Sequence, residues 1–238
     1  MKLTKKIGGK TMRFKKENIV ELNHVLESGK ENFPFESSFK DVVEMDPNGN
    51  ARAHAEGVWY IESEVHMHSH VGTHIEVPFH HKFDGPDCAD YPIENLVGEA
   101  FVMDCTGKKA GDFITLEEIR KYEDRLLPGD MILFHTGFDR KFHEPDWEPF
   151  PHVEKEAIVW LLETFNPPVI GTDASGIEVP DDDTQPNHTN CFENNTAIIE
   201  SLTNLEQVNE ERVTLFVLPL RMKRVDSCAS RVIAIRNM

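Results

Sequence analysis

Half of the twelve histidines in this 238-residue chain fall between His66 and His81, in the segment VHMHSHVGTHIEVPFHH. The odd-numbered positions of this segment are mainly apolar, whereas the even-numbered ones are His66, His68, His70, Gly72, His74, Glu76, Pro78 and His80. A period of two is typical of extended backbone, which places one set of side chains on each face. The polar set therefore predicts a histidine-rich face with one carboxylate.

Such a face serves one site only if the segment bends. Fully extended, His70 and His80 would lie ~33 Å apart. Gly72 and Pro78 are residues that bend or end strands, and together with the β-branched residues they also disfavour a helix. We therefore expect the segment to curl around a centre.

Imidazole and carboxylate are the ligands that Zn, Mn and Fe share in proteins. A divalent ion lowers the pKa of its water from 15.7 to about 7, and a histidine that does not bind the ion can carry the proton. The segment therefore indicates a metal-dependent hydrolase.

The elements that position this segment follow from local patterns. Apolar or β-branched runs predict strands at Ile19–Leu22, Val58–Ser69, Phe101–Asp104, Met131–His135, Val169–Thr172, Val213–Leu218 and Val232–Ile235. The capping box Thr115-Leu-Glu-Glu118 begins a helix that ends near Arg125, and apolar residues at helical spacing predict a second over Glu154–Phe165. A loop is expected after Leu22, through Pro34 and up to Pro47–Asn50. About seven or eight strands with two or three helices indicate an α/β or α+β domain.

Composition narrows the functional class. The formal net charge is −17, which repels phosphate backbones and disfavours nucleic-acid binding. The sequence contains no run of ~18 apolar residues, which is the length needed to span a membrane. Its basic N-terminal segment lacks the apolar stretch of a signal peptide, so we expect a cytoplasmic protein. Four widely spaced cysteines, with no CxxC pair, indicate reduced, buried thiols; Cys191, near a candidate ligand, is the one to watch.

The stretch His70-Val-Gly-Thr-His74-Ile-Glu76-Val-Pro78-Phe-His80 closely resembles the HxGTHxDxPxH motif of the cyclase-type metal-dependent hydrolases. This family includes bacterial kynurenine formamidases and isatin hydrolases. A second block, His188 followed by Glu200 in AIIESLTNL, resembles the family's downstream ligand pair, and the resemblance extends from about Ile19 to Ile235.

The resemblance implies a single domain over residues 1–238, with the β-rich α/β fold of the cyclase-like (swivelling β/β/α) type, a few helices and a mixed sheet. It implies a homodimer or homotetramer that hydrolyses an amide, formamide, cyclic imide or lactone of a small molecule. One or two divalent ions, Zn or Mn, would be held by a defined ligand set, and His80 would be the general acid and base. The implied ligands are His70, His74, Glu76, His188 and Glu200.

Several other residues have two readings. Glu76 stands where the family motif has Asp, and its extra methylene changes the reach of the carboxylate. Asp173 either orients a ligand or caps a loop. His66 and His68 are expected to support the site from outside or to lie on the surface rather than to bind the metal, and His81 is expected to be structural. The aromatic residues could line a pocket or fill the core: Trp59, Phe79, Phe138 and Trp147.

Two other functions compete with the hydrolase. A cupin-type metal oxygenase would use His68, His70 and a later glutamate, but the gap to Glu76 is wrong and capped helices do not suit an all-β barrel. A metal-binding protein without catalysis is the second alternative. A serine hydrolase is disfavoured because Ser175 lies in Thr-Asp-Ala-Ser-Gly and no G-x-S-x-G elbow is present.

Overall fold

The computed structural model describes residues 15–41, 58 and 60–236. Its largest sheet has the strand order β1-β12-β11-β5-β7-β9-β10-β4, and β12 also pairs with β4. That pairing closes the sheet into a barrel, with β1 added at its edge. The pairs β5–β7, β7–β9 and β9–β10 are parallel and the others antiparallel, so the sheet is mixed, as predicted. The strands are β1 (Ile19–Glu21), β4 (His74–Glu76), β5 (Val97–Asp104), β7 (Met131–His135), β9 (Val169–Thr172), β10 (Ala197–Glu200), β11 (Arg212–Pro219) and β12 (Ser227–Arg236).

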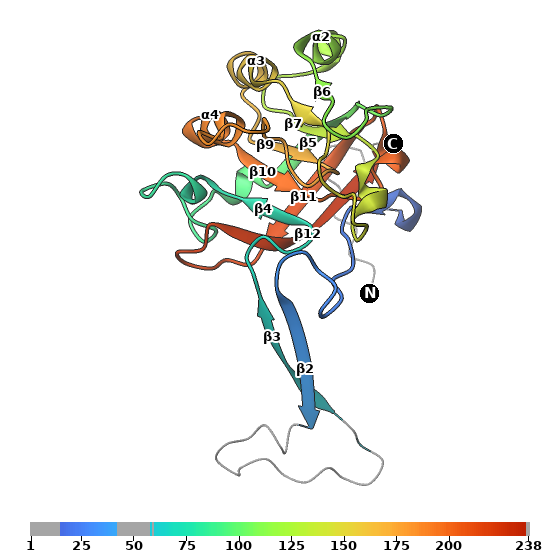
Figure 1. The fold of residues 1–238 in the computed structure, drawn as a ribbon, viewed down its shortest axis with the longest axis vertical. Helices are drawn as coiled ribbons and strands as arrows, with labels where there is room; N and C mark the ends of the chain where they lie inside the picture. The colour runs from blue at the N-terminus through green and yellow to red at the C-terminus, as the bar shows by residue number, and fades with distance from the viewer. Residues whose placement is uncertain (1–14, 42–57, 59, 237–238) are drawn as a thin grey trace, which may run out of the picture.

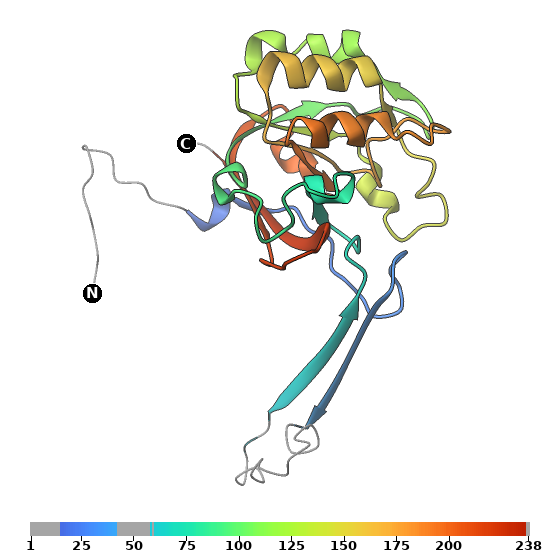
Figure 2. The same cartoon turned by 90° about the vertical axis from the view of Figure 1, so that its left-hand side faces the viewer.

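Helices cover one side of this barrel. Figure 1 shows the helices α2, α3 and α4 above the strands, and Figure 2 shows them as a layer along one side. The α-helices are α2 (Leu116–Arg120), α3 (Lys155–Phe165) and α4 (Pro186–Glu193). The 3-10 helices are η1 (Lys16–Asn18), η2 (Pro78–His80), η3 (Ile93–Asn95), η4 (Glu123–Arg125), η5 (Phe138–Lys141) and η6 (Leu205–Val208). Within the described residues, no helix is long and apolar enough to cross a membrane.

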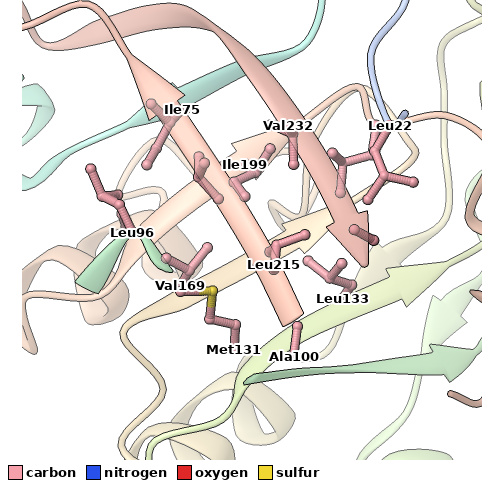
Figure 3. Close-up of a cluster of buried hydrophobic side chains, with 14 of the residues drawn as sticks. Leu22, Ile75, Leu96, Ala100, Met131, Leu133, Val169, Ile199, Leu215 and Val232 are labelled. Carbon is pink, nitrogen blue, oxygen red and sulfur yellow. The ribbon is translucent and has the colours of Figure 1, made fainter. Parts of the chain in front are cut away.

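The core has two layers because the strands β4, β7, β9 and β10 bury side chains on both faces. One cluster fills the barrel, where Ile75, Leu133, Ile199 and Leu215 from four strands point toward one another (Figure 3). The other lies between the sheet and the helices and includes Phe134, Ile158 and Phe192. Parallel strands covered on both faces read as continuous apolar runs, which is why Met131–His135 and Val169–Thr172 were predictable to the residue.

Two smaller sheets complete the structure. Strands β6 (Phe113–Ile114) and β8 (His152–Val153) pair beside the helices. Strands β2 (Phe35–Asp41) and β3 (Ile61–Met67) form an antiparallel ribbon that projects from the barrel (Figures 1 and 2). We call this ribbon the arm.

The sequence-based assignments are confirmed for the fold class, and the capping box of Thr115 and Glu118 is present. Helix α2 ends at Arg120, however, and the turn up to Arg125 is 3-10. The loop predicted after Leu22 is wrong over Phe35–Asp41, which forms β2, while Pro47–Asn50 lies outside the described residues. The strand count was too low, since the described part holds twelve strands, several of them only two to four residues long.

Candidate metal centre

The histidine segment curls as predicted. Strand β3 ends at Met67, Gly72 takes a positive φ of 59°, and only His74–Glu76 forms a strand before Pro78 begins η2. A φ in this left-handed region favours glycine because it has no Cβ. The bend at Gly72 lets His70 and His74 point toward the same centre, with their ring centroids 5.1 Å apart.

The carboxylate of Glu76 lies at the middle of four imidazole rings. Its Oε1 is 2.7 Å from Nδ1 of His70, 3.5 Å from Nε2 of His74 and 3.9 Å from Nε2 of His80. Its Oε2 is 3.3 Å from Nε2 of His188. Glu76 is only 2% exposed, so its negative charge is removed from water and must be compensated by these neighbouring groups.

The second sequence block reaches the same centre through strand pairing. Strand β10 pairs antiparallel with β4, and the register sets Glu200 opposite His74. The Glu200 carboxylate lies 3.5 Å from Nε2 of His74 and 3.4 Å from Nε2 of His188, which comes from α4. All six predicted site residues therefore lie together, although His188 and Glu200 are more than a hundred positions away from His70 in the sequence.

Outer hydrogen bonds fix two of the rings. Nδ1 of His74 lies 2.8 Å from the carbonyl oxygen of Gly72, and Nδ1 of His188 lies 2.8 Å from Glu178 Oε2. The Glu178 carboxylate also accepts the backbone N–H groups of Asn187 and His188 at the start of α4. Both rings thus turn Nε2 toward the centre, which is the arrangement that histidine ligands of metals adopt.

Asp226 joins the remaining two rings. Its Oδ2 is 2.9 Å from Nε2 of His70 and 2.8 Å from Nδ1 of His80. Burial opposes ionisation of Asp226, but hydrogen bonds from His70 and His80 outweigh it and lower its pKa to about 2. Asp226 precedes β12 directly, and it reaches the centre because Ser227 pairs with Glu76.

The sequence analysis did not identify Asp226 and Glu178 as residues of the site. Each is a single acidic residue in a chain with 42 of them, and neither belongs to a periodic pattern. The spacing of ten residues from Glu178 to His188 carries no known signature, so only the three-dimensional structure identifies either residue.

Electrostatics show that the centre needs positive charge. Burial opposes ionisation of Glu76, but the rings of His188, His70 and His74 outweigh it and hold the pKa of Glu76 well below its usual value. Burial likewise opposes protonation of His74, but Glu200 and Glu76 outweigh it and raise the pKa of His74 to about 10. The Glu76 carboxylate is thus ionised and requires compensation, either from protons on the rings or from a cation.

The distances favour a cation. Contacts of 3.3–3.5 Å between Nε2 of His74 or His188 and the carboxylates are too long for good hydrogen bonds. Two ligands at ~2.1 Å from a tetrahedral ion lie ~3.4 Å apart, which matches these separations. Nε2 of His74 and Oε2 of Glu76 are also buried without a hydrogen-bond partner. The residues therefore fit a divalent ion, and His74, Glu76 and Glu200 form one possible ligand group.

A second possible ligand group consists of His70, Glu76 and His80. It shares Glu76 with the first group, so the geometry accommodates one ion or two. His80 is the most exposed of these three residues. Its Nδ1 is hydrogen-bonded to Asp226, and this contact orients the ring so that Nε2 faces Glu76.

A cavity adjoins the centre. Its lining includes His70, His74 and Glu200 of the centre and the aromatic residues Phe33, Phe142 and Trp147. Phe33 stacks on His68 with the ring centroids 4.7 Å apart. A larger cavity near α2, lined by residues within 104–122, contains none of the cluster residues.

The other residues weighed in the sequence take structural positions. Asp173 accepts hydrogen bonds from the backbone of Thr136 and Gly137, and thus caps a loop. Cys191 is free, and burial raises the pKa of its thiol to about 12, so it is not a reactive thiol. Phe138 packs in a small core cluster, Phe79 packs against the barrel core, and Trp59 lies outside the described residues.

Comparisons with known proteins agree with this fold and site. The profile of the family described as "Putative cyclase" matches residues 20–179. A kynurenine formamidase from Erythrobacter litoralis is 30% identical over 169 residues, which cover 70% of this chain and 73% of the relative. An isatin hydrolase A structure from Ralstonia solanacearum superposes with a TM-score of 0.76 at 20% identity and covers 92% of both chains. A structure titled a potential metal-dependent hydrolase with cyclase activity has a TM-score of 0.73 at 24% identity, covering 92% of this chain and 98% of the other.

Proposed function

Since this chain belongs to the cyclase family and is a metal-dependent hydrolase, we propose that it cleaves an amide, formamide, cyclic imide or lactone bond of a small molecule at the Glu76 cluster. One observation carries the proposal. The Nε2 atoms of His74 and His188 and the carboxylates of Glu76 and Glu200 converge at ligand-to-ligand distances in a buried site. The family match, together with the parallel strands and helices of the fold, argues against the cupin-type oxygenase.

His74, Glu76, His188 and Glu200 would hold the ion. His70, whose Nδ1 lies beside the Glu76 carboxylate, would be the fifth ligand. A bound Zn or Mn ion supplies Lewis acidity toward a carbonyl oxygen and lowers the pKa of water to about 7. The role of the protein is then to fix these ligands, which Gly72 and Glu178 support through the outer ring nitrogens.

His80 would act as the general base and then as the general acid. With Nδ1 hydrogen-bonded to Asp226, its Nε2 can accept the proton of the attacking water. The water oxygen bonds to the carbonyl carbon, and His80 returns the proton to the leaving nitrogen or oxygen as that bond breaks. The ionised Asp226 stabilises the imidazolium that exists between the two steps.

We choose an aromatic substrate for the first test. Phe33, which is 45% exposed, offers an aromatic face beside the cluster, whereas Phe142 and Trp147 also line the cavity but are almost fully buried in a small core cluster. The names of the relatives, kynurenine formamidase and isatin hydrolase, agree with this choice. Aromatic formamides and cyclic imides are therefore the first compounds to test, followed by lactones.

The test compares wild type with His80→Ala in a hydrolysis screen on metal-loaded protein. We expect wild type to hydrolyse an aromatic formamide or cyclic imide, and the variant to retain its metal yet lose about 10²–10⁴-fold in kcat. His66→Ala, which changes an exposed histidine of the arm, is the matched control and should keep full activity.

Other outcomes would contradict parts of this account. Loss of metal in His80→Ala would make His80 a ligand, and an unchanged rate would remove it from the mechanism. Failure of fully loaded wild type to hydrolyse any compound of the screen would favour metal binding without catalysis.

A further inference from the structure

The cavity beside the metal centre is also lined by polar residues that the mechanism above does not use. These residues are Glu31, Asn32, Glu148 and Ser175. His74, which lines the same cavity, is 3% exposed, and its Nε2 is buried without a hydrogen-bond partner. Buried polar atoms normally have partners, so this cavity is built to receive a bound group, and its other polar residues are candidates for contacts with the substrate.

Buried neighbours hold Glu148 and Ser175 at this cavity. Trp147, which precedes Glu148, is 4% exposed, and Ala174, which precedes Ser175, is fully buried in the same small core cluster. The backbone N–H of Ser201 donates to the carbonyl oxygen of Ala174 at 2.9 Å, which ties this loop to the end of β10. The hydroxyl of Ser175 donates to Oε1 of Glu148 at 3.0 Å. Glu148 is exposed, yet its position is fixed from two sides.

This pair lies close to the metal centre. Gly176 follows Ser175 directly, and a Cβ at this position would lie only 3.0 Å from Oε1 of Glu200. The backbone beside Ser175 therefore lies against a carboxylate of the centre. A small molecule whose carbonyl group reaches the centre through this cavity thus has its other substituents within reach of Glu148 and Ser175.

The charge of the cavity favours one class of substituent. Within the described part of the chain, no lysine or arginine lines it. Glu31 has a fully buried side chain and lies 3.3 Å from Nε2 of His143, whereas Glu148 has no such cationic neighbour among the ion pairs of the described residues. Metal ligands bind as carboxylates, so Glu76, Glu200 and Glu148 together bring three negative charges against the two positive charges of one divalent ion. A site with an excess of one sign attracts the opposite charge.

The hydrogen-bonding capacity of Glu148 points the same way. A carboxylate has about four acceptor sites and no donor, whereas an ammonium group has three donors and no acceptor. Ser175 uses one acceptor site of Glu148, so further sites remain for the N–H groups of an ammonium. A substrate carboxylate would meet only like charge at this position.

We propose that Glu148, oriented by Ser175, determines the charge specificity of this site and selects substrates that carry an ammonium group over those that carry a carboxylate. This inference rests on the proposed function, because the selected group belongs to the molecule whose carbonyl is hydrolysed. It narrows the substrate to basic aromatic formamides, cyclic imides or lactones.

Three para-substituted N-phenylformamides test the selection on metal-loaded protein at low ionic strength. They carry an aminomethyl, a hydroxymethyl or a carboxylate group, and the first two differ in charge but little in size. We expect kcat/KM of wild type to be highest for the ammonium compound and lowest for the carboxylate. A partly exposed ion pair of this kind should favour the ammonium over the neutral compound about fivefold, and Glu148→Gln should bring this ratio close to one. Glu144→Gln, an exposed residue of the same loop that does not line the cavity, is the matched control and should keep the wild-type ratio.

Calorimetric binding of the ammonium and neutral compounds to the same proteins separates this inference from the proposed function. If wild type binds the ammonium compound preferentially and Glu148→Gln does not, but no compound is hydrolysed, the hydrolysis proposal fails and selection by Glu148 is supported. Four results would each overturn the selection. They are a wild type without the preference in turnover and binding, a wild type that neither binds nor hydrolyses the ammonium compound, an unchanged ratio in Glu148→Gln, and an equal loss in Glu144→Gln.

Discussion

At the scale of single residues, the position of Glu76 dominates the centre. Its carboxylate contacts four imidazoles at 2.7–3.9 Å and belongs to both possible ligand groups. The extra methylene relative to the aspartate of the family motif sets how far this carboxylate reaches. A catalytic constellation tolerates only ~0.5 Å of error, so the surrounding rings must be placed for glutamate.

Shortening this residue should therefore be harmful. We expect Glu76→Asp to lower metal affinity or kcat/KM at least tenfold, about 1.4 kcal/mol. Calorimetric titration of metal into wild type and variant measures the affinity, and Glu94→Asp, an exposed position in η3, is the control. An aspartate variant that matches wild type at the same stoichiometry would show that Glu76 is only a tolerated substitute.

Glu178 allows a test of the supporting contacts without altering a ligand. Its carboxylate holds Nδ1 of His188 at 2.8 Å. Removing such an outer partner costs about 10–100-fold in metal affinity, and we expect this loss in Glu178→Gln. Glu193→Gln, an exposed residue of α4 that pairs with Lys82, should bind metal as wild type does. If both variants bound metal with the same affinity, the hydrogen bond from Glu178 would not be needed to orient the ring of His188.

At the scale of elements, strong local signals predicted structure and weak ones did not. The capping box of α2 and the apolar runs of β7 and β9 were found because each depends on neighbouring residues alone. Helix α4 was missed because PNHTNCFE is polar and has no side-chain cap. Strand β2 was missed because FESSFKD lacks the β-branched residues that mark a strand, and within the described part of the chain its side chains are mostly exposed.

The capping box also gives a prediction on pH. Partial burial opposes ionisation of Glu118, but hydrogen bonds from Lys108 and Thr115 outweigh it and lower its pKa from 4.5. A carboxyl group whose pKa is lower in the folded state stabilises the fold above its unfolded pKa, and this contribution is lost as the pH falls through the folded pKa. Glu118→Gln should therefore reduce the free energy of unfolding at pH 7, and its difference from wild type should shrink below pH 4.5.

Urea unfolding of both proteins between pH 7 and pH 3 measures this difference. Glu117→Gln, the neighbouring residue outside the box, is the control and should follow wild type. A difference between Glu118→Gln and wild type that stays constant over this range would show that the charge of Glu118 does not stabilise the cap.

At the scale of the whole molecule, the centre lies on the seam where the barrel closes. Strand β4 carries His74 and Glu76 and pairs with both β10, which carries Glu200, and β12, which Asp226 precedes. Sequence resemblance could align His188 and Glu200 with family ligands, but their place beside His74 depends on this closure. Pairing of β1 with β12 also joins the two ends of the described chain, which supports our proposal that residues 1–238 form one domain.

The central claim is that an ion held at this seam is required for hydrolysis. The direct measurement follows turnover of an aromatic formamide or cyclic imide, identified as a substrate in the screen, by protein dialysed against a chelator and then titrated with Zn or Mn. We expect turnover to disappear with the metal and to return in proportion to the ion bound, and Glu200→Gln to need a higher metal concentration while keeping its fold. Full turnover in metal-free wild type would contradict the account.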